Sequence, residues 1–188
     1  MKRTHAFFIL LATAALLLAT PAFAANCTTD CTILGSSGND IIYGTTGNDV
    51  ICGLEGLDNI TSGPSGVFSG TGKDKMCGDE GIDFMQAIDG NDAFDGGLFT
   101  NDYDDANGGT GNDLFLMRGG DDEAWGSSGN DTMWGGSGDD LLRGSTGNDS
   151  IYGQADDDAL AGNGGTDYLD GGSGTDSCST GETLVNCE

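Results

Sequence analysis

From Gly108 to Ser179 the chain reads GGTGNDLFL, MRGGDDEAW, GSSGNDTMW, GGSGDDLLR, GSTGNDSIY, GQADDDALA, GNGGTDYLD and GGSGTDSCS, eight phrases of nine residues without a gap. Glycine recurs near positions 1 and 4 of the phrase, aspartate at position 6 and an apolar residue at position 8. A fixed period of this kind indicates a stack of repeated structural units.

The same phrase extends toward the N-terminus with two interruptions. Units of nine residues also occupy 35–43, 44–52, 53–61, 69–77, 78–86 and 87–95. Residues 62–68 and 96–98 are insertions, and Phe99–Asn107 is a degenerate unit that lacks the turn glycines. The repeat region is therefore expected to span residues 35–179.

Each phrase predicts a turn followed by a short strand. Glycine permits the backbone conformations of a tight turn. In the x-U-x segment that follows, the apolar residue U points inward and its neighbours point outward. Two units make one coil, so residues 18 apart stack in the strand-pairing direction. One predicted core column contains Ile51, Met76, Phe94, Phe115, Met133, Ile151 and Leu169. The other contains Ile42, Ile60, Met85, Ala106, Ala124, Leu142, Leu160 and Cys178.

The phrase resembles the G-G-x-G-x-D-x-U-x nonapeptide of the RTX, or haemolysin-type, calcium-binding proteins. The resemblance implies an all-β fold, a right-handed parallel β-roll (β-solenoid) of two facing short-stranded parallel sheets. It also implies several Ca²⁺ ions, each lying between consecutive turns and bound by their aspartates and loop carbonyls.

The chemistry of the aspartates favours the same ion. Carboxylates stacked about 4.8 Å apart repel one another unless a hard cation lies between them. Calcium takes six to eight oxygen ligands in flexible geometry, whereas magnesium, the second choice, demands an octahedron. One inward side chain per nine residues is too thin a core to offset the ordering entropy of so many glycines, so the cation is expected to drive folding. The predicted ligands are Asp40, Asp49, Asp58, Asp74, Asp83, Asp92, Asp113, Asp122, Asp131, Asp140, Asp149, Asp158, Asp167 and Asp176.

Three departures from the phrase bear on these sites. Lys73 and Lys75 flank Asp74, and the degenerate unit makes Asp104 doubtful as a ligand. Weak or empty sites are expected at both places. Asp156 stands where the position-4 glycine is expected. The Asn or Asp that often fills position 5 is interpreted as a support of the turn.

The ends of the chain predict export and capping. Residues 1–24 combine Lys2 and Arg3, an apolar run and an Ala-Phe-Ala cleavage site, which is typical of a signal peptide. A membrane anchor is the alternative, although the run is short for spanning. Residues 25–34 and 180–188 are expected to cap the repeats, and the protein to be secreted, extracellular and without a membrane span once the signal is removed.

The six cysteines suit disulfides in an oxidising compartment. The predicted pairs are Cys27–Cys31, Cys52–Cys77 and Cys178–Cys187. The second pair requires residues 62–68 to bulge out of one turn, which would make the two cysteines neighbours in one sheet. If the insertion instead forms an extra half-coil, they fall on opposite sheets.

Charge and residue types limit the function. A net charge of −25 excludes nucleic acid as a natural partner and disfavours anionic membranes. His5, the only histidine, lies in the signal, so no triad is possible and no enzyme activity is expected.

The prediction is a secreted calcium-binding protein with a structural or surface role. The alternative is a calcium-dependent adhesin or carbohydrate-binding module, with a polysaccharide or cell-surface component as partner. Its outward aromatic face would use Trp134, Tyr152 and Tyr168, with Trp125 on the other sheet.

Overall fold

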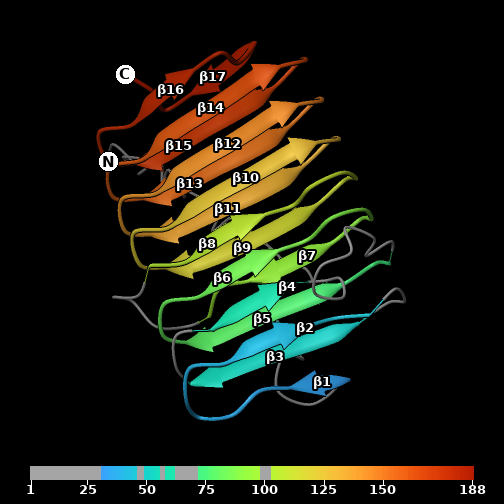
Figure 1. The fold of residues 1–188 in the computed structure, drawn as a ribbon. Helices are drawn as coiled ribbons and strands as arrows, with labels where there is room; N and C mark the ends of the chain where they lie inside the picture. The colour runs from blue at the N-terminus through green and yellow to red at the C-terminus, as the bar shows by residue number, and fades with distance from the viewer. Residues whose placement is uncertain (1–30, 46–48, 56–57, 62–71, 98–102) are drawn as a thin grey trace, which may run out of the picture.

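The structure, a computed structural model, describes residues 31–45, 49–55, 58–61, 72–97 and 103–188. These residues form strands and turns, with no helix among them, and the strands make two parallel sheets (Figure 1). The predicted all-β solenoid of two facing parallel sheets is therefore confirmed. Residues 1–30, which include the predicted signal peptide and Cys27, lie outside the described segments.

The odd-numbered strands form one sheet and the even-numbered strands form the other. In order, the nine-stranded sheet contains β1 (Ile33–Leu34), β3 (Val50–Glu55), β5 (Lys75–Glu80), β7 (Ala93–Asp95), β9 (Leu114–Gly119), β11 (Thr132–Ser137), β13 (Ser150–Ala155), β15 (Tyr168–Ser173) and β17 (Thr183–Val185). The eight-stranded sheet contains β2 (Ile41–Tyr43), β4 (Asn59–Thr61), β6 (Phe84–Gln86), β8 (Asp105–Asn107), β10 (Glu123–Ser128), β12 (Leu141–Thr146), β14 (Ala159–Gly164) and β16 (Ser177–Ser179).

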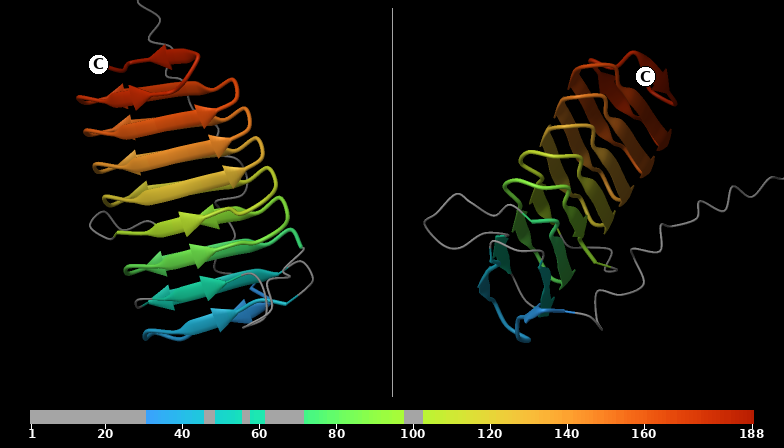
Figure 2. Two further views of the ribbon diagram at one scale, coloured as in Figure 1. Left: turned by 45° about the horizontal axis from the view of Figure 1, so that its top comes forward. Right: turned by 90° about the vertical axis from the view of Figure 1, so that its right-hand side faces the viewer.

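The chain alternates between the two sheets at every unit, so it winds into successive coils (Figure 2). The register follows the predicted period: Met133 pairs with Ile151, and Leu142 with Leu160, each 18 residues apart. The short segments at the two ends, β1 and β17, each add the outermost strand of the nine-stranded sheet.

Neither insertion disturbs this register. Ile51 pairs with Met76 across residues 62–68, and Phe94 pairs with Phe115 across residues 96–98. The two phenylalanine rings stack with centroids 4.5 Å apart and planes 4° apart. Position 8 therefore meets position 8 throughout, and Cys52 and Cys77 lie on adjacent strands of one sheet rather than on opposite sheets.

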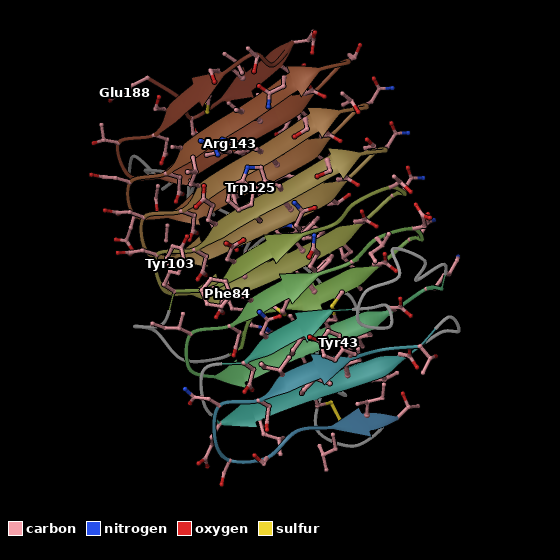
Figure 3. The ribbon with its side chains drawn as sticks, viewed as in Figure 1. Tyr43, Phe84, Tyr103, Trp125, Arg143 and Glu188 are labelled. Atoms are coloured by element: carbon pink, nitrogen blue, oxygen red, sulfur yellow. A yellow bond between two sulfur atoms is a disulfide. The ribbon has the colours of Figure 1, made fainter. Side chains whose placement is uncertain are left out.

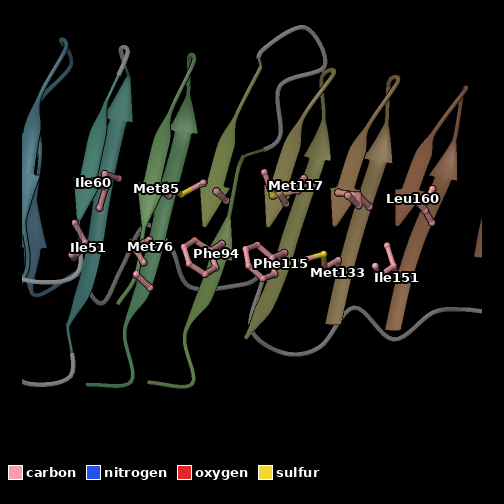
Figure 4. Packing of buried hydrophobic residues seen from close by; sticks show 14 of the residues in the cluster. Ile51, Ile60, Met76, Met85, Phe94, Phe115, Met117, Met133, Ile151 and Leu160 are labelled. Atoms are coloured by element: carbon pink, nitrogen blue, oxygen red, sulfur yellow. The ribbon is translucent and has the colours of Figure 1, made fainter. Parts of the chain in front are cut away.

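The core is one narrow, continuous cluster of side chains that lie between the sheets and come from both of them (Figure 4). All residues predicted at position 8 belong to it, with Cys178 partly buried at its end. The sequence analysis missed Ala87 and Met117, which occupy position 1, where most units have glycine. Their side chains are buried in the same cluster and thicken the core at the middle of the stack.

Two of the three predicted disulfides are wrong. Cys31 bonds to Cys52, with Cα atoms 6.0 Å apart, which excludes both Cys27–Cys31 and Cys52–Cys77. Cys52 and Cys77 are indeed register partners on adjacent strands, and Cys77 is itself disulfide-bonded. Directly paired residues of parallel strands point their Cβ atoms the same way at about 4.8 Å, which is wider than a disulfide accepts. Cys31 lies just before β1 and is free of that constraint.

The remaining bridge is present as predicted. Cys178 of β16 bonds to Cys187, nine residues further on, with Cα atoms 5.6 Å apart. This disulfide links the last residues of the chain to the end of the core, where a bridge that caps the C-terminal end was expected.

Candidate metal centre

The position-6 aspartates form two continuous columns, one at each side of the coil stack. In each column the backbone N–H of one aspartate donates to Oδ1 of the aspartate one coil later, at 2.8 to 3.0 Å. The first column contains Asp40, Asp58, Asp83, Asp104, Asp122, Asp140, Asp158 and Asp176. The second contains Asp49, Asp74, Asp92, Asp113, Asp131, Asp149 and Asp167. The period of 18 thus brings together all fourteen predicted ligands.

Most of these carboxylates are buried, and in eight of them the second oxygen has no hydrogen-bond donor among the described residues. Except for Asp40, every aspartate of the columns is at most 6 % exposed. Within the described residues no donor reaches Oδ2 of Asp58, Asp92, Asp113, Asp131, Asp140, Asp149, Asp158 or Asp167. A buried carboxylate oxygen without a donor or cation costs several kcal/mol of folding free energy. The columns therefore contain a repeated electrostatic deficit that the polypeptide does not correct.

Backbone oxygens gather at the same points. A Cβ placed on Gly135 would overlap Oδ2 of Asp140 and would lie 2.9 Å from the carbonyl oxygen of Gly153 in the next coil. The same arrangement recurs at Gly108, where the neighbours are Oδ2 of Asp113 and the carbonyl oxygen of Gly126. These two position-1 glycines thus leave room beside a carboxylate oxygen and a carbonyl oxygen from two successive coils.

The pKa values of these aspartates reflect the missing counter-charge. Desolvation by burial raises the pKa of Asp113 and of Asp140 to about 8, and neighbouring aspartates of the same column raise it further, although a backbone hydrogen bond opposes the shift. The same causes raise the pKa of Asp158 to about 7 and that of Asp92 and Asp131 to about 6. Without a cation, several of these groups would hold a proton near neutral pH.

The donor set fits a hard cation. Within the described segments no group of three or more His, Cys, Asp or Glu side chains gathers around one point, so each ion would depend on backbone carbonyls as well as carboxylates. Carboxylate and carbonyl oxygens in a flexible shell are the ligands that Ca²⁺ prefers. The aspartates with orphaned Oδ2 atoms and the carbonyls of the next coil are the groups that would hold it.

The first two units differ from the others. Oδ2 of Asp40 accepts hydrogen bonds from the backbone N–H and the hydroxyl of Ser36, and Oδ2 of Asp49 accepts the equivalent pair from Thr45. The residue at position 2 therefore donates hydrogen bonds to the aspartate carboxylate of its own turn. We expect these two aspartates to need a cation less than those further along the stack.

Asp104, which the sequence analysis treated as doubtful, keeps its place in the first column. It is 2 % exposed, accepts the N–H of Asp83 and donates its own N–H to Asp122, so it continues the column through the degenerate unit. Its distance of 18 residues from Asp122 is the signal that could have identified it. Glu182 is a second omission, because its Oε2 atom accepts the N–H of Asp167 and ends the other column.

The lysine-flanked unit also keeps its aspartate in place. Asp74 is 3 % exposed and is joined to Asp49 and Asp92 through the backbone ladder, although Lys73 and Lys75 lie beside it in the chain. A weak or empty site here stays a prediction, as it does at the degenerate unit.

Position 5 forms a second ladder that runs in the opposite direction. The N–H of Asn130 donates to Oδ1 of Asn112 in the preceding coil, and the N–H of Asn148 donates to Oδ1 of Asn130. Asp121, Asp139 and Asp157 repeat the pattern on the other side. These residues support the neighbouring turn rather than their own.

The aromatic face that the sequence indicated is largely engaged with itself. On the nine-stranded sheet the rings of Trp134 and Tyr152 stack with centroids 5.5 Å apart, and Tyr168 lies 5.6 Å beyond Tyr152. Tyr152 therefore has a stacked ring on one side and a ring tilted by 46° on the other. This arrangement favours a role in sheet stability over ligand binding.

None of the described segments forms a helix with the length and apolar character that a membrane crossing requires.

Comparison with known proteins agrees with this geometry. Among curated proteins no sequence matches the chain. The family described as RTX calcium-binding nonapeptide repeat (4 copies) matches residues 32–63, 68–103, 107–142, 118–151 and 143–178. The matches cover most of the chain and coincide with the stacked turns that carry the aspartate columns, so the protein belongs to the family of RTX calcium-binding nonapeptide repeat proteins.

Proposed function

We propose that this is a secreted protein whose β-roll forms when several calcium ions bind between the stacked turns, and that its role is structural, at a cell surface or in a matrix. The family is calcium-binding, which supports the ion. Export is supported by the signal-like residues 1–24 and by the disulfides, which form and persist in oxidising compartments.

The observation that carries calcium-dependent folding is the series of buried Oδ2 atoms without donors. Two carboxylates about 4.8 Å apart repel each other by about 3 kcal/mol at an effective dielectric constant of about 20. Summed along the two aspartate columns, this repulsion exceeds the free energy that burial of the narrow apolar core can supply. Binding free energy would therefore become folding free energy, as in other small metal-dependent domains.

The proposal assigns no catalytic activity. The only histidine is His5 in the signal-like segment, and the aspartates of the columns are buried rather than arranged around an open cleft. A nucleophile with a positioned base is what an acyl- or phosphoryl-transfer site would need.

The test is far-UV circular dichroism of the disulfide-bonded protein, first stripped of metal and then titrated with calcium. We expect a coil-like spectrum in chelator that becomes β-rich with calcium and stays coil-like at the same concentration of magnesium. A β-rich spectrum in chelator would refute calcium-driven folding. Calcium binding could then still be measured by calorimetry as a ligand equilibrium of a folded protein.

A further inference from the structure

The outer face of the eight-stranded sheet carries a shallow groove of about 360 Å³. It is lined by Asn59 of β4, Phe84, Met85 and Gln86 of β6, Asp105 and Asn107 of β8, and Trp125 of β10. Figure 3 shows Phe84 and Trp125 on this face, with Tyr103 and Arg143 near them. Apart from Met85, which is a core residue at position 8, the lining residues occupy the outward positions 7 and 9 of their units.

The register of the strands explains why the groove lies here. Phe84 pairs with Asp105, and Asn107 pairs with Trp125, so large aromatic side chains on β6 and β10 flank shorter polar ones on β8. The two rings are two strands and two residues apart, roughly 12 Å by the dimensions of a sheet. Asp105 and Asn107 of the degenerate unit supply the floor, which gives that unit a role beyond continuing the stack.

Trp125 is held in place from the side away from the groove. The guanidinium carbon of Arg143, on the next strand β12, lies 5.6 Å from the centre of the Trp125 ring. Nη1 of Arg143 also donates to Oε1 of Glu123 at 3.3 Å, and the hydroxyl of Tyr103 donates to Oε2 of the same carboxylate at 2.9 Å. The ring thus has a cation–π partner on its β12 side, while on the β8 side its register partner is Asn107, which also lines the groove.

The floor and rim present oriented hydrogen-bonding groups. Oδ1 of Asn107 accepts the N–H of Gly109 and the hydroxyl of Ser127, both at 3.1 Å, which leaves its Nδ2 donors for a ligand. The exposed amides of Asn59 and Gln86 add donors and acceptors, and the half-buried carboxylate of Asp105 adds an acceptor. The groove therefore combines two aromatic faces with groups that bind hydroxyls.

We propose that this groove binds a neutral glycan. A pyranose presents an apolar C–H face, which suits Phe84 and Trp125, and a rim of hydroxyls, which suits the amides and the carboxylate. Asp105 and the net charge of −25 exclude anionic polysaccharides from this face. Glu123 is already paired with Arg143 and Tyr103, so a cationic ligand would find only Asp105. This inference goes beyond calcium binding and needs only that the β-roll be folded.

The experiment probes the calcium-loaded, disulfide-bonded protein on an array of neutral, acidic and amino oligosaccharides, and then measures the affinity for the best neutral one by calorimetry. We expect binding confined to neutral glycans. Trp125→Ala should weaken it roughly tenfold or more, and Phe84→Ala, at a 38 % exposed residue, should weaken it severalfold. Trp134→Ala is the matched control, because that ring lies on the other sheet and should leave glycan affinity unchanged.

Circular dichroism in the same calcium buffer confirms the fold of each variant, and Phe84→Ala decides the question if Trp125→Ala does not fold. The proposal is overturned if the folded protein binds no neutral glycan, if it prefers acidic or amino sugars, or if both groove variants bind as tightly as the parent. Loss of the calcium-induced spectral change would instead overturn calcium-driven folding. Because the array is run on folded protein in calcium, the two failures are distinguishable.

Discussion

The backbone N–H of Asp140 donates to Oδ1 of Asp158, one coil further along, at 2.9 Å, while Oδ2 of Asp158 lies buried without a hydrogen-bond donor among the described residues. One oxygen of this carboxylate thus links adjacent coils, and the other is left for a cation. The same side chain supports the ladder and creates the deficit that calcium would relieve.

Replacing Asp140 with Asn should separate these two roles. The amide oxygen can still accept the N–H of Asp122, but a charged ligand is lost and a donor replaces Oδ2. We expect the calcium midpoint of the circular dichroism transition to rise about tenfold, because affinity depends on the charge of the ligands. In chelator the same variant should be more stable than the parent, because the parent must bury the Asp140 charge or take up a proton in order to fold.

Asp139→Asn is the matched control. Asp139 is the exposed neighbour in the same turn, and its Oδ1 atom accepts the N–H of Asp157, which an amide oxygen can also do. The same change of charge there should move the calcium midpoint by no more than about twofold. Equal shifts for the two variants would show that only general surface charge matters.

Gly147→Ala should destabilise the stack through backbone strain. Gly147 has a φ of +137°, and a Cβ there would overlap the carbonyl oxygen of Gly129 in the preceding coil. Strain and overlap together are expected to cost about 2–4 kcal/mol in the free energy of unfolding, measured by denaturant in saturating calcium.

Gly38→Ala tests the same position of the repeat where no such overlap exists. A Cβ on Gly38 meets no described atom within 4 Å, and its φ lies outside the left-handed region. Its unfolding free energy should stay within about 0.5 kcal/mol of the parent. A large loss in both variants would mean that glycine is required for a reason other than the contact between coils.

The calcium-free protein should become less stable as pH rises. The pKa values of Asp113 and Asp140 are raised to about 8, so the folded state retains protons that the unfolded chain releases near pH 4. Stability from these groups is complete below the unfolded pKa and is lost as pH rises toward 8. The β content of the metal-free protein, measured by far-UV circular dichroism, should therefore fall between pH 5 and pH 8.

Asp140→Asn should flatten this pH dependence more than Asp139→Asn, because only the former removes a buried titrating group. In calcium the trend should reverse, since protons compete with the ion for the same carboxylates. A β content that rises with pH in metal-free buffer would contradict the prediction.

Peptide mapping without reduction should recover Cys31 linked to Cys52 and Cys178 linked to Cys187. Removing the first bridge with Cys31→Ser and Cys52→Ser together should lower the unfolding free energy by about 3 kcal/mol, as expected for a closed segment of 21 residues. Recovery of a Cys52–Cys77 peptide would show that the register partners do pair.

Particular residues show how far the sequence could be read. Ile151 and Asp149 were both placed correctly, because residues at positions 8 and 6 face the same neighbours in every coil. Met117 was missed as a core residue because its position is glycine in most units, and a pattern describes the majority. Asp104 was doubted because its own unit lacks turn glycines, although the neighbouring coils on both sides hold it in register.

The nine-residue period was enough to establish the two parallel sheets, the apolar core and the two aspartate columns. Two units of nine residues make one coil, so residues 18 apart in the sequence occupy equivalent places in adjacent coils. The tertiary structure decided what depends on side-chain direction and on contacts between unlike units. The direction of the Cβ atoms on adjacent parallel strands prevents a disulfide between Cys52 and Cys77, and Cys52 pairs with Cys31 instead. Ser36 and Thr45 donate hydrogen bonds to the carboxylates of Asp40 and Asp49, which the equivalent residues do not do in the eight described turns whose Oδ2 atoms lack a donor. The groove between Phe84 and Trp125 belongs to this second class, because it needs the register to survive both insertions and Arg143 to fix one ring.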